Sequence, residues 1–464
     1  MTMNCKFPAK NNNSIFFKTL FSLAFPIILQ NLMQTFVNML DTIMVGRLGG
    51  IEIASVGLGN QVYFMLSMVI FGITSGGSIF ISQFWGQGNI KGIRHVTGIM
   101  LFGSAAFSLL FFVGAFFFPE FLLGLFSKDR EVILKGISYL KIVAFSYPVT
   151  AVSIAFQMAF RSTEHVYLPM FCTGVSLVLN VILNALLIFG CSFSFTGITV
   201  TVPSLGVAGA ALATLICRCV ELVIVLFVSY TKKYEVWGKL RDFLSFNRSF
   251  ALKVIKTSLP VLISETVWGL GITFQNGIFA RCGTDAIAAF NITNTISQLT
   301  WVFFIGMGNA SAIILGKKIG AGDICGAKWY VNRFIWFMPL TGALIGLFLI
   351  PLSHLLPFLF NVEANVLEMA RQMIYVLVAV YPLRAFNMLL IVGICRSGGD
   401  TFFGMAIDNG FMWIVSIPLA VTAAFVLKLP PYAVMIFLES EQLLKAGAGL
   451  PRVLSGKWLH VVTK

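Results

Sequence analysis

Four polar residues lie at nearly the same depth within long apolar segments of the chain. Asp41 and Asn184 lie about 9 Å, and Thr214 about 12 Å, from one end of their segments at 1.5 Å per residue. Asn180 precedes Asn184 by four residues and therefore shares its helix face. A carboxylate, two amide oxygens and a hydroxyl suit Na⁺ or a proton. We therefore expect these four residues to form a cation-binding and coupling site, with Na⁺ as its candidate metal ion.

A second polar group lies nearer the opposite ends of other apolar segments. Glu265 lies about 14 Å, and Asp408 about 12 Å, from the charged residues that precede their segments. Ionisable groups are costly in lipid, and by default they mark ion or substrate pathways. We expect the two acids to face one cavity and take up protons or cations, and we assign Gln275 to the same substrate or second acidic site.

These residues also have structural interpretations. A buried aspartate with two asparagines can be a hydrogen-bonded link between helices. Arg384 and Lys141 could neutralise the acids of the second site, and Arg218 with Glu221 has the spacing of an end-of-helix ion pair. For Asp41 we favour a functional role, because a carboxylate is a costly structural link in lipid.

The elements that must position these residues are transmembrane helices. Hydrophobic residues make up 58% of the 464 residues and charged residues only 11%, too few for the surface of a soluble protein. Apolar stretches long enough to cross lipid as helices recur, without the alternation of a membrane β-barrel. We predict an all-α integral membrane protein with twelve transmembrane helices at 16–45, 53–84, 96–119, 132–160, 166–190, 206–230, 252–280, 287–316, 331–357, 364–395, 401–427 and 430–447.

The two halves of the chain are related by a shift of 234 residues. This shift keeps glycine, proline and arginine positions in register from the first predicted helix to the loop after the fourth, aligning Pro26 with Pro260, Arg47 with Arg281, and Gly86 with Gly320. Each half holds an even number of spans, so we predict two pseudo-symmetric six-helix bundles that are parallel repeats. We expect Pro26 and Pro260 to bend their helices.

The longest charged connection separates the two bundles. We expect an N-terminal six-helix lobe at 1–230, a cytoplasmic inter-lobe loop at 231–250, a C-terminal six-helix lobe at 251–447 and a cytoplasmic tail at 448–464. Lys and Arg are about three times as numerous in the loops on the N-terminal side of the membrane, where we count Arg161, Arg396 and Lys445. Because such loops face the cytoplasm, we expect both termini there.

Several functional classes are disfavoured by the sequence. It contains neither the GxxxxGK[ST] motif of an ATP-driven pump nor the HExxH motif of a zinc protease. The net charge of +14 fits cytoplasmic loops better than nucleic-acid binding. We expect a monomer in contact with membrane lipid, with no enzymatic activity, no cofactor beyond a coupling ion and no nucleic-acid partner.

Four segments resemble the MATE (multidrug and toxic compound extrusion) transporters. The residues from Asp41 to Gly49, DTIMVGRLG, are similar to the family's helix 1 signature, and RSGGDT at 396–401 is similar to its loop between helices 10 and 11. Residues 180–187 and 206–214 resemble its helices 5 and 6. The resemblance covers nearly the whole chain, including the tail from Glu441 onward.

The resemblance implies an inner-membrane antiporter that exports amphipathic, often cationic organic compounds, such as drugs and toxins, in exchange for inward Na⁺ or H⁺. It also implies a cation site at Asp41, Asn180, Asn184 and Thr214. Where some relatives have an acid on helix 5 this chain has Asn184, which favours Na⁺. A lipid-linked oligosaccharide flippase of the same superfamily is the alternative, and a channel or membrane-embedded enzyme fits less well.

Overall fold

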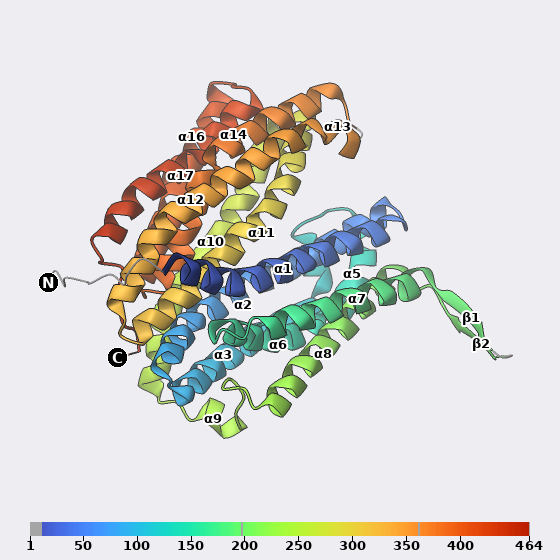
Figure 1. Ribbon diagram of the computed structural model, residues 1–464. Coiled ribbons are helices and arrows are strands. Elements are labelled where there is room, and N and C mark those ends of the chain that lie inside the picture. The colour runs from blue at the N-terminus through green and yellow to red at the C-terminus, as the bar shows by residue number, and fades with distance from the viewer. Residues whose placement is uncertain (1–11, 196–197, 361, 464) are drawn as a thin grey trace. The chain divides into compact units, whose positions relative to one another are not determined.

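Long helices account for most of the computed structural model, which describes residues 12–195, 198–360 and 362–463 (Figure 1). The first half and the connection after it contain α1 (Asn12–Gly46), α2 (Gly50–Gln87), α3 (Ile90–Phe117), α4 (Pro119–Gly124), α5 (Arg130–Ala144), α6 (Ser146–Ser162), α7 (Tyr167–Phe189), α8 (Gly206–Lys232) and α9 (Leu240–Leu244). The second half contains α10 (Arg248–Arg281), α11 (Thr284–Gly320), α12 (Ile324–His354), α13 (Leu356–Leu359), α14 (Ala364–Met388), η1 (Leu389–Arg396), α15 (Thr401–Phe411), η2 (Met412–Ser416), α16 (Ile417–Val421), η3 (Thr422–Val426) and α17 (Pro431–Leu454).

All twelve predicted spans coincide with helical segments. Nine segments within the described residues are long and apolar enough to cross a membrane, and the bent pair of α5 and α6 makes a tenth. The more polar α10 and α17 coincide with the other two predicted spans. The prediction of an all-α, multi-pass membrane protein with twelve transmembrane helices is confirmed.

The fourth predicted span, 132–160, is not one straight helix. It consists of α5 and α6, which meet at Phe145 with a bend of 47°. Pro148 lies in the first turn of α6, where it lacks the backbone N–H that would continue the ladder from α5. The bend therefore lies beside Pro148.

Two predicted spans in the second half contain π-helical turns. The helix α14 continues into η1, and α15 continues through η2, α16 and η3. Pro418 lies between η2 and η3, where its ring and missing N–H disturb the regular hydrogen-bond ladder. Such turns change the direction in which side chains project from a helix without ending the helix.

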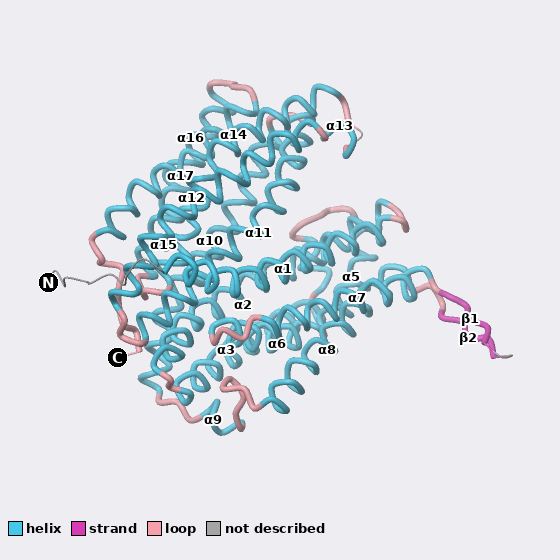
Figure 2. Tube along the Cα trace, in the orientation of Figure 1, coloured by secondary structure: helices cyan, strands magenta, loops and turns pink. Residues whose placement is uncertain are grey.

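The connection between α7 and α8 contains an unpredicted β-hairpin (Figure 2). The strands β1 (Cys191–Phe195) and β2 (Ile198–Val202) pair antiparallel, with Cys191 opposite Val202 and Phe195 opposite Ile198. The sequence Ile-Thr-Val-Thr-Val in β2 consists of β-branched residues, which favour strands. We expected only a loop here because the hairpin is short and adjoins two strongly apolar helices.

The chain forms two compact units. The N-terminal unit comprises Leu29–Ile81 and Ile90–Ile255, and the C-terminal unit comprises Met1–Ile28, Ser82–Asn89 and Lys256–Lys464. The predicted lobes follow the internal repeat, whereas in these units the start of α1 and the end of α2 belong to the C-terminal unit and the start of α10 belongs to the N-terminal unit. These three helices therefore contribute to both units.

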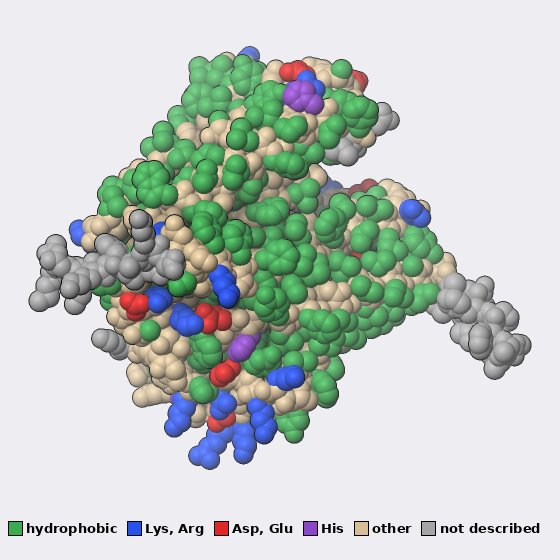
Figure 3. All heavy atoms as spheres, in the orientation of Figure 1, with side chains coloured by type: hydrophobic (Ala, Val, Ile, Leu, Met, Phe, Trp, Pro, Cys, Tyr) green, Lys and Arg blue, Asp and Glu red, His purple; other side chains and the backbone are tan. Residues whose placement is uncertain are grey.

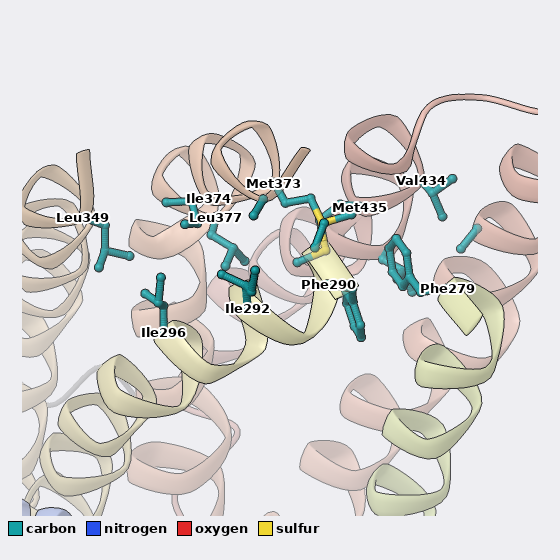
Figure 4. Close-up of a cluster of buried hydrophobic side chains, with 14 of the residues drawn as sticks. Phe279, Phe290, Ile292, Ile296, Leu349, Met373, Ile374, Leu377, Val434 and Met435 are labelled. Atoms are coloured by element: carbon teal, nitrogen blue, oxygen red, sulfur yellow. The ribbon is translucent and has the colours of Figure 1, made fainter. Parts of the chain in front are cut away.

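Each unit has an apolar core. In the C-terminal unit, side chains from α10, α11, α12, α14 and α17 converge in one buried cluster (Figure 4). Phe279 stacks on Phe290 within it, with ring centroids 4.0 Å apart. In the N-terminal unit a separate cluster surrounds Tyr139 and Tyr147. These cores hold the helices that carry the polar residues in fixed register.

The outer surface is largely apolar. Figure 3 shows hydrophobic side chains over most of the visible face, with Lys and Arg side chains gathered around the segment that contains α9. Trp336 and Phe348 are 77% and 70% exposed. Large aromatic side chains exposed along a helix are expected where the surrounding medium is lipid.

Close packing of α12 against α14 depends on Gly342. A Cβ atom at this position would lie 2.5 Å from the carbonyl oxygen of Tyr381 and 2.9 Å from the Cβ of Ala385. We predict that Gly342→Ala lowers the thermal unfolding midpoint of the purified protein in detergent, through an overpacking cost of about 1–3 kcal/mol.

Gly410 is the matched control because a Cβ added there would meet nothing within 4 Å. Gly410→Ala should leave the midpoint unchanged or raise it, since Ala is the better helix former. Equal midpoints for the two variants would show that the α12–α14 contact tolerates a side chain.

Candidate functional site

Three of the four residues predicted to bind a cation meet in the N-terminal unit. The side-chain amide of Asn184 donates a hydrogen bond to Asp41 Oδ1 and a second, of 3.1 Å, to Asn180 Oδ1. Asn180 and Asn184 lie on one face of α7 and are buried, and Asp41 is half-buried on α1. Asn184 Oδ1 is also buried, and among the described residues it has no hydrogen-bond donor.

The fourth predicted residue, Thr214, forms a different contact. Its hydroxyl donates a 3.0 Å hydrogen bond to the carbonyl of Ala210, one turn earlier in α8. This bond to its own helix satisfies the hydroxyl donor and leaves the oxygen lone pairs as the only contribution that Thr214 could make to a cation.

Asp41 has no basic partner among the other three residues of the predicted cation site. Arg218 on α8 lies within electrostatic range of Asp41, but it forms a 2.9 Å ion pair with Glu221. The predicted pair of Arg218 and Glu221 therefore forms, but Glu221 is buried in the middle of α8 and not at its end. Arg218 therefore faces two carboxylates and pairs with Glu221, which leaves Asp41 without a basic partner of its own among the described residues and suits a cation site.

A chain of buried side chains continues from Glu221 to α1. Gln157 on α6 donates to Glu221 Oε1 at 3.0 Å and accepts from Gln30 Nε2 at 2.8 Å. Gln30 on α1 in turn accepts from Arg161 Nη2 at 2.6 Å. This network connects α1 to α6 and α8, and sequence analysis missed it because amide side chains give no charge signal.

The predicted second acidic site contains two ion pairs. Glu265 on α10 pairs with Arg396 in η1, and Asp408 on α15 pairs with Lys445 on α17 at 2.8 Å. The helices α10 and α15 are neighbours, since Asn409 Nδ2 donates to Ser264 Oγ at 2.8 Å. Glu265 and Asp408 therefore pair with different basic residues.

The basic residues expected to neutralise these acids lie elsewhere. Arg384 on α14 forms a bidentate pair with Glu439 on α17, including an Nε–Oε2 bond of 2.8 Å, and Lys141 is exposed on α5. The actual partners, Arg396 and Lys445, are buried within helices, although we counted both as loop residues. Without Arg396 and Lys445, Lys and Arg are still more numerous in the loops on the N-terminal side of the membrane than in those on the other side.

The remaining predicted residues lie within helices. Gln275 is half-buried on α10. Pro26 and Pro260 lie inside α1 and α10, and each of these helices continues past its proline. The boundary between the units falls after Ile28, two residues beyond Pro26.

Sequence analysis also did not predict that three charged residues of α17 are buried. Glu439, Glu441 and Lys445 are 7%, 6% and 3% exposed. The available signal was the spacing of Glu441 and Lys445 by four residues within an apolar helix, which places opposite charges one turn apart.

Known proteins resemble this chain over most of its length. The probable multidrug resistance protein NorM of Thermotoga maritima is 24% identical over 453 residues, covering 95% of this chain and 93% of that protein. The probable multidrug resistance protein YoeA of Bacillus subtilis is 24% identical over 407 residues, covering 87% of this chain and 86% of that protein.

The fold is also found in solved structures. The Vibrio cholerae MATE transporter VcmN in its bent form superposes with a TM-score of 0.85 at 19% identity, covering 97% of this chain and 100% of that chain. The MatE family model matches residues 26–186 and 260–450, one segment in each half of the repeat. The chain belongs to the MatE family of multidrug efflux transporters, which are membrane transporters and not enzymes.

Proposed function

We propose that this chain is a secondary active antiporter that exports amphipathic, cationic organic compounds by alternating access, in exchange for Na⁺ or H⁺ moving inward. The relatives named as multidrug resistance proteins support the substrate class. The protein acts as a monomer in the cell membrane, with both termini in the cytoplasm, as the distribution of Lys and Arg favours.

The observation that carries this proposal is the environment of Asp41. Its hydrogen bond comes from the amide of Asn184, and the nearby Arg218 is already paired with Glu221. A carboxylate held by an amide in an apolar span keeps its negative charge available, whereas Glu265 and Asp408 have basic partners. The oxygens of Asp41, Asn180 and Asn184 would bind Na⁺, or the carboxylate would bind H⁺.

The helix α1 is the element through which this binding would act. It carries Asp41 near one end and Gln30 and Pro26 further along, and its residues are shared between the two units. A cation bound at Asp41 neutralises the negative charge of its carboxylate. This change favours a different bend of α1 at Pro26, where the helix lacks a backbone hydrogen bond. The changed bend of α1 would favour release of substrate on the outer side of the membrane.

Substrate binding would involve the second acidic site. An organic cation that approaches Glu265 or Asp408 must compete with Arg396 or Lys445 for the carboxylate. Such competition makes substrate binding sensitive to the arrangement of α10, α15 and α17, which alternating access would change. Gln275 on α10 adds an uncharged polar group to this proposed surface.

The first test removes the charge of Asp41 while keeping its shape. We predict that Asp41→Asn lowers the export of a fluorescent organic cation from membrane vesicles by about tenfold, the size of a coupling free energy of 1–3 kcal/mol. Glu131→Gln is the matched control, because Glu131 is exposed at the start of α5. Unchanged export by Asp41→Asn in vesicles of equal protein content would refute coupling at Asp41.

The second test concerns the amide that positions Asp41. We predict that Asn184→Ala raises the ion concentration for half-maximal transport by about tenfold, the equivalent of 1.4 kcal/mol, because a hydrogen bond and an oxygen ligand are lost. Maximal transport at saturating ion should persist. Asn365→Ala, at an exposed position of α14, should leave both quantities unchanged. A reduced maximal rate with unaltered half-saturation would contradict a role in ion binding.

A further inference from the structure

A compact group of charged side chains lies inside the C-terminal unit, where α14, α15 and α17 meet. The ammonium of Lys445 donates hydrogen bonds to Asp408 Oδ1 at 2.8 Å and to Glu441 Oε1 at 3.0 Å. The amide of Gln442 donates a further bond to Glu441 Oε1 at 3.1 Å. Lys445 is only 3% exposed, so bulk water does not screen these charges.

The charges of this group do not balance. Lys445 carries one positive charge and faces two carboxylates, those of Asp408 and Glu441. The other charged pair nearby, Arg384 with Glu439, is neutral as a whole. In full ionisation the cluster therefore holds one uncompensated negative charge.

The other elements packed on α17 do not supply the missing positive charge. The segments η2, α16 and η3 contain no charged residue. Arg396, the charged residue of η1, forms an ion pair with Glu265. An uncompensated charge in a buried, apolar environment is strongly unfavourable, so the group is expected to be neutralised.

Two buried oxygens without hydrogen-bond partners in the described part of the chain indicate where a proton could neutralise the excess negative charge. Glu441 accepts both of its hydrogen bonds on Oε1, while Oε2 is buried with no hydrogen-bond partner among the described residues. Asn387 Oδ1, a hydrogen-bond acceptor, is likewise buried without a partner, and the amide nitrogen of Asn387 donates to Gln442. A proton on Glu441 Oε2 would cancel the excess charge and turn a bare acceptor into a donor.

We propose that Glu441 is a proton-binding site of the C-terminal unit, holding one proton on Oε2 at neutral pH while Asp408 and Lys445 remain charged. Binding joins one H⁺ to the carboxylate and brings the charge of the cluster to zero. The ammonium of Lys445 already occupies the position between the carboxylates that a metal ion would take, so the ligand is a proton and not Na⁺. This site is distinct from the proposed ion site at Asp41, which lies in the other unit.

Infrared spectroscopy of the purified full chain in lipid tests this directly, because a protonated carboxyl has its own carbonyl band, which shifts in deuterated water. At neutral pH the difference spectrum between wild type and Glu441→Gln should contain that band. Glu368→Gln is the control, since Glu368 is half exposed on α14, and its difference spectrum should lack the band. A wild-type minus Glu441→Gln spectrum without the band would overturn the proposal.

Two further variants change the charge balance in opposite directions. Asp408→Asn leaves one carboxylate for Lys445, so the Glu441 band should be lost. Lys445→Met leaves two carboxylates without a cation, so the band should grow about twofold as both take up protons. A band that persists in Asp408→Asn and stays constant in Lys445→Met would refute the charge argument. Because the spectra require no transport, their outcome is independent of the test at Asp41.

Discussion

The cost of burying charge in an apolar interior is the constraint on which this structure depends. The helices present bulky apolar side chains outward, so ionic groups between them must find partners inside the protein. Glu265, Asp408 and Glu439 each have a basic partner on another segment, and those pairs fix how α10, α14, η1, α15 and α17 pack. The departures from full pairing, at Asp41 and Glu441, are where ions would bind.

The internal repeat places comparable contacts in the two halves, with different chemistry. Arg161 and Arg396 are equivalent after a one-residue insertion, and each reaches back to the first helix of its own half. In the first half the acceptor is the neutral amide of Gln30, and in the second it is the carboxylate of Glu265. A shared backbone framework thus carries a polar network in one half and an ion pair in the other, which would let the halves bind different ligands.

The sequence predicted those features that depend on local composition. Continuous apolar runs define helices, and depth along a helix follows from residue number, which is why Asp41 and Asn184 could be expected to meet. The partners of Glu265 and Asp408 could not be found in this way, because they depend on the register between helices distant in the chain. The bend at Phe145 and the π-helical turns η2 and η3 depend on how the backbone relaxes around Pro148 and Pro418. The roles of Asp41, Asn180, Asn184 and Thr214 stay predictions.

The central claim is that an inward ion movement is obligatorily exchanged for substrate. The most direct measurement uses proteoliposomes loaded with a fluorescent organic cation and no ion gradient, with uptake of Na⁺ and of H⁺ followed while the substrate leaves. Obligatory antiport predicts that substrate efflux drives net uptake of one of these ions although no ion gradient is imposed, and that Asp41→Asn abolishes this uptake. Substrate efflux at the wild-type rate with no accompanying movement of either ion would contradict it.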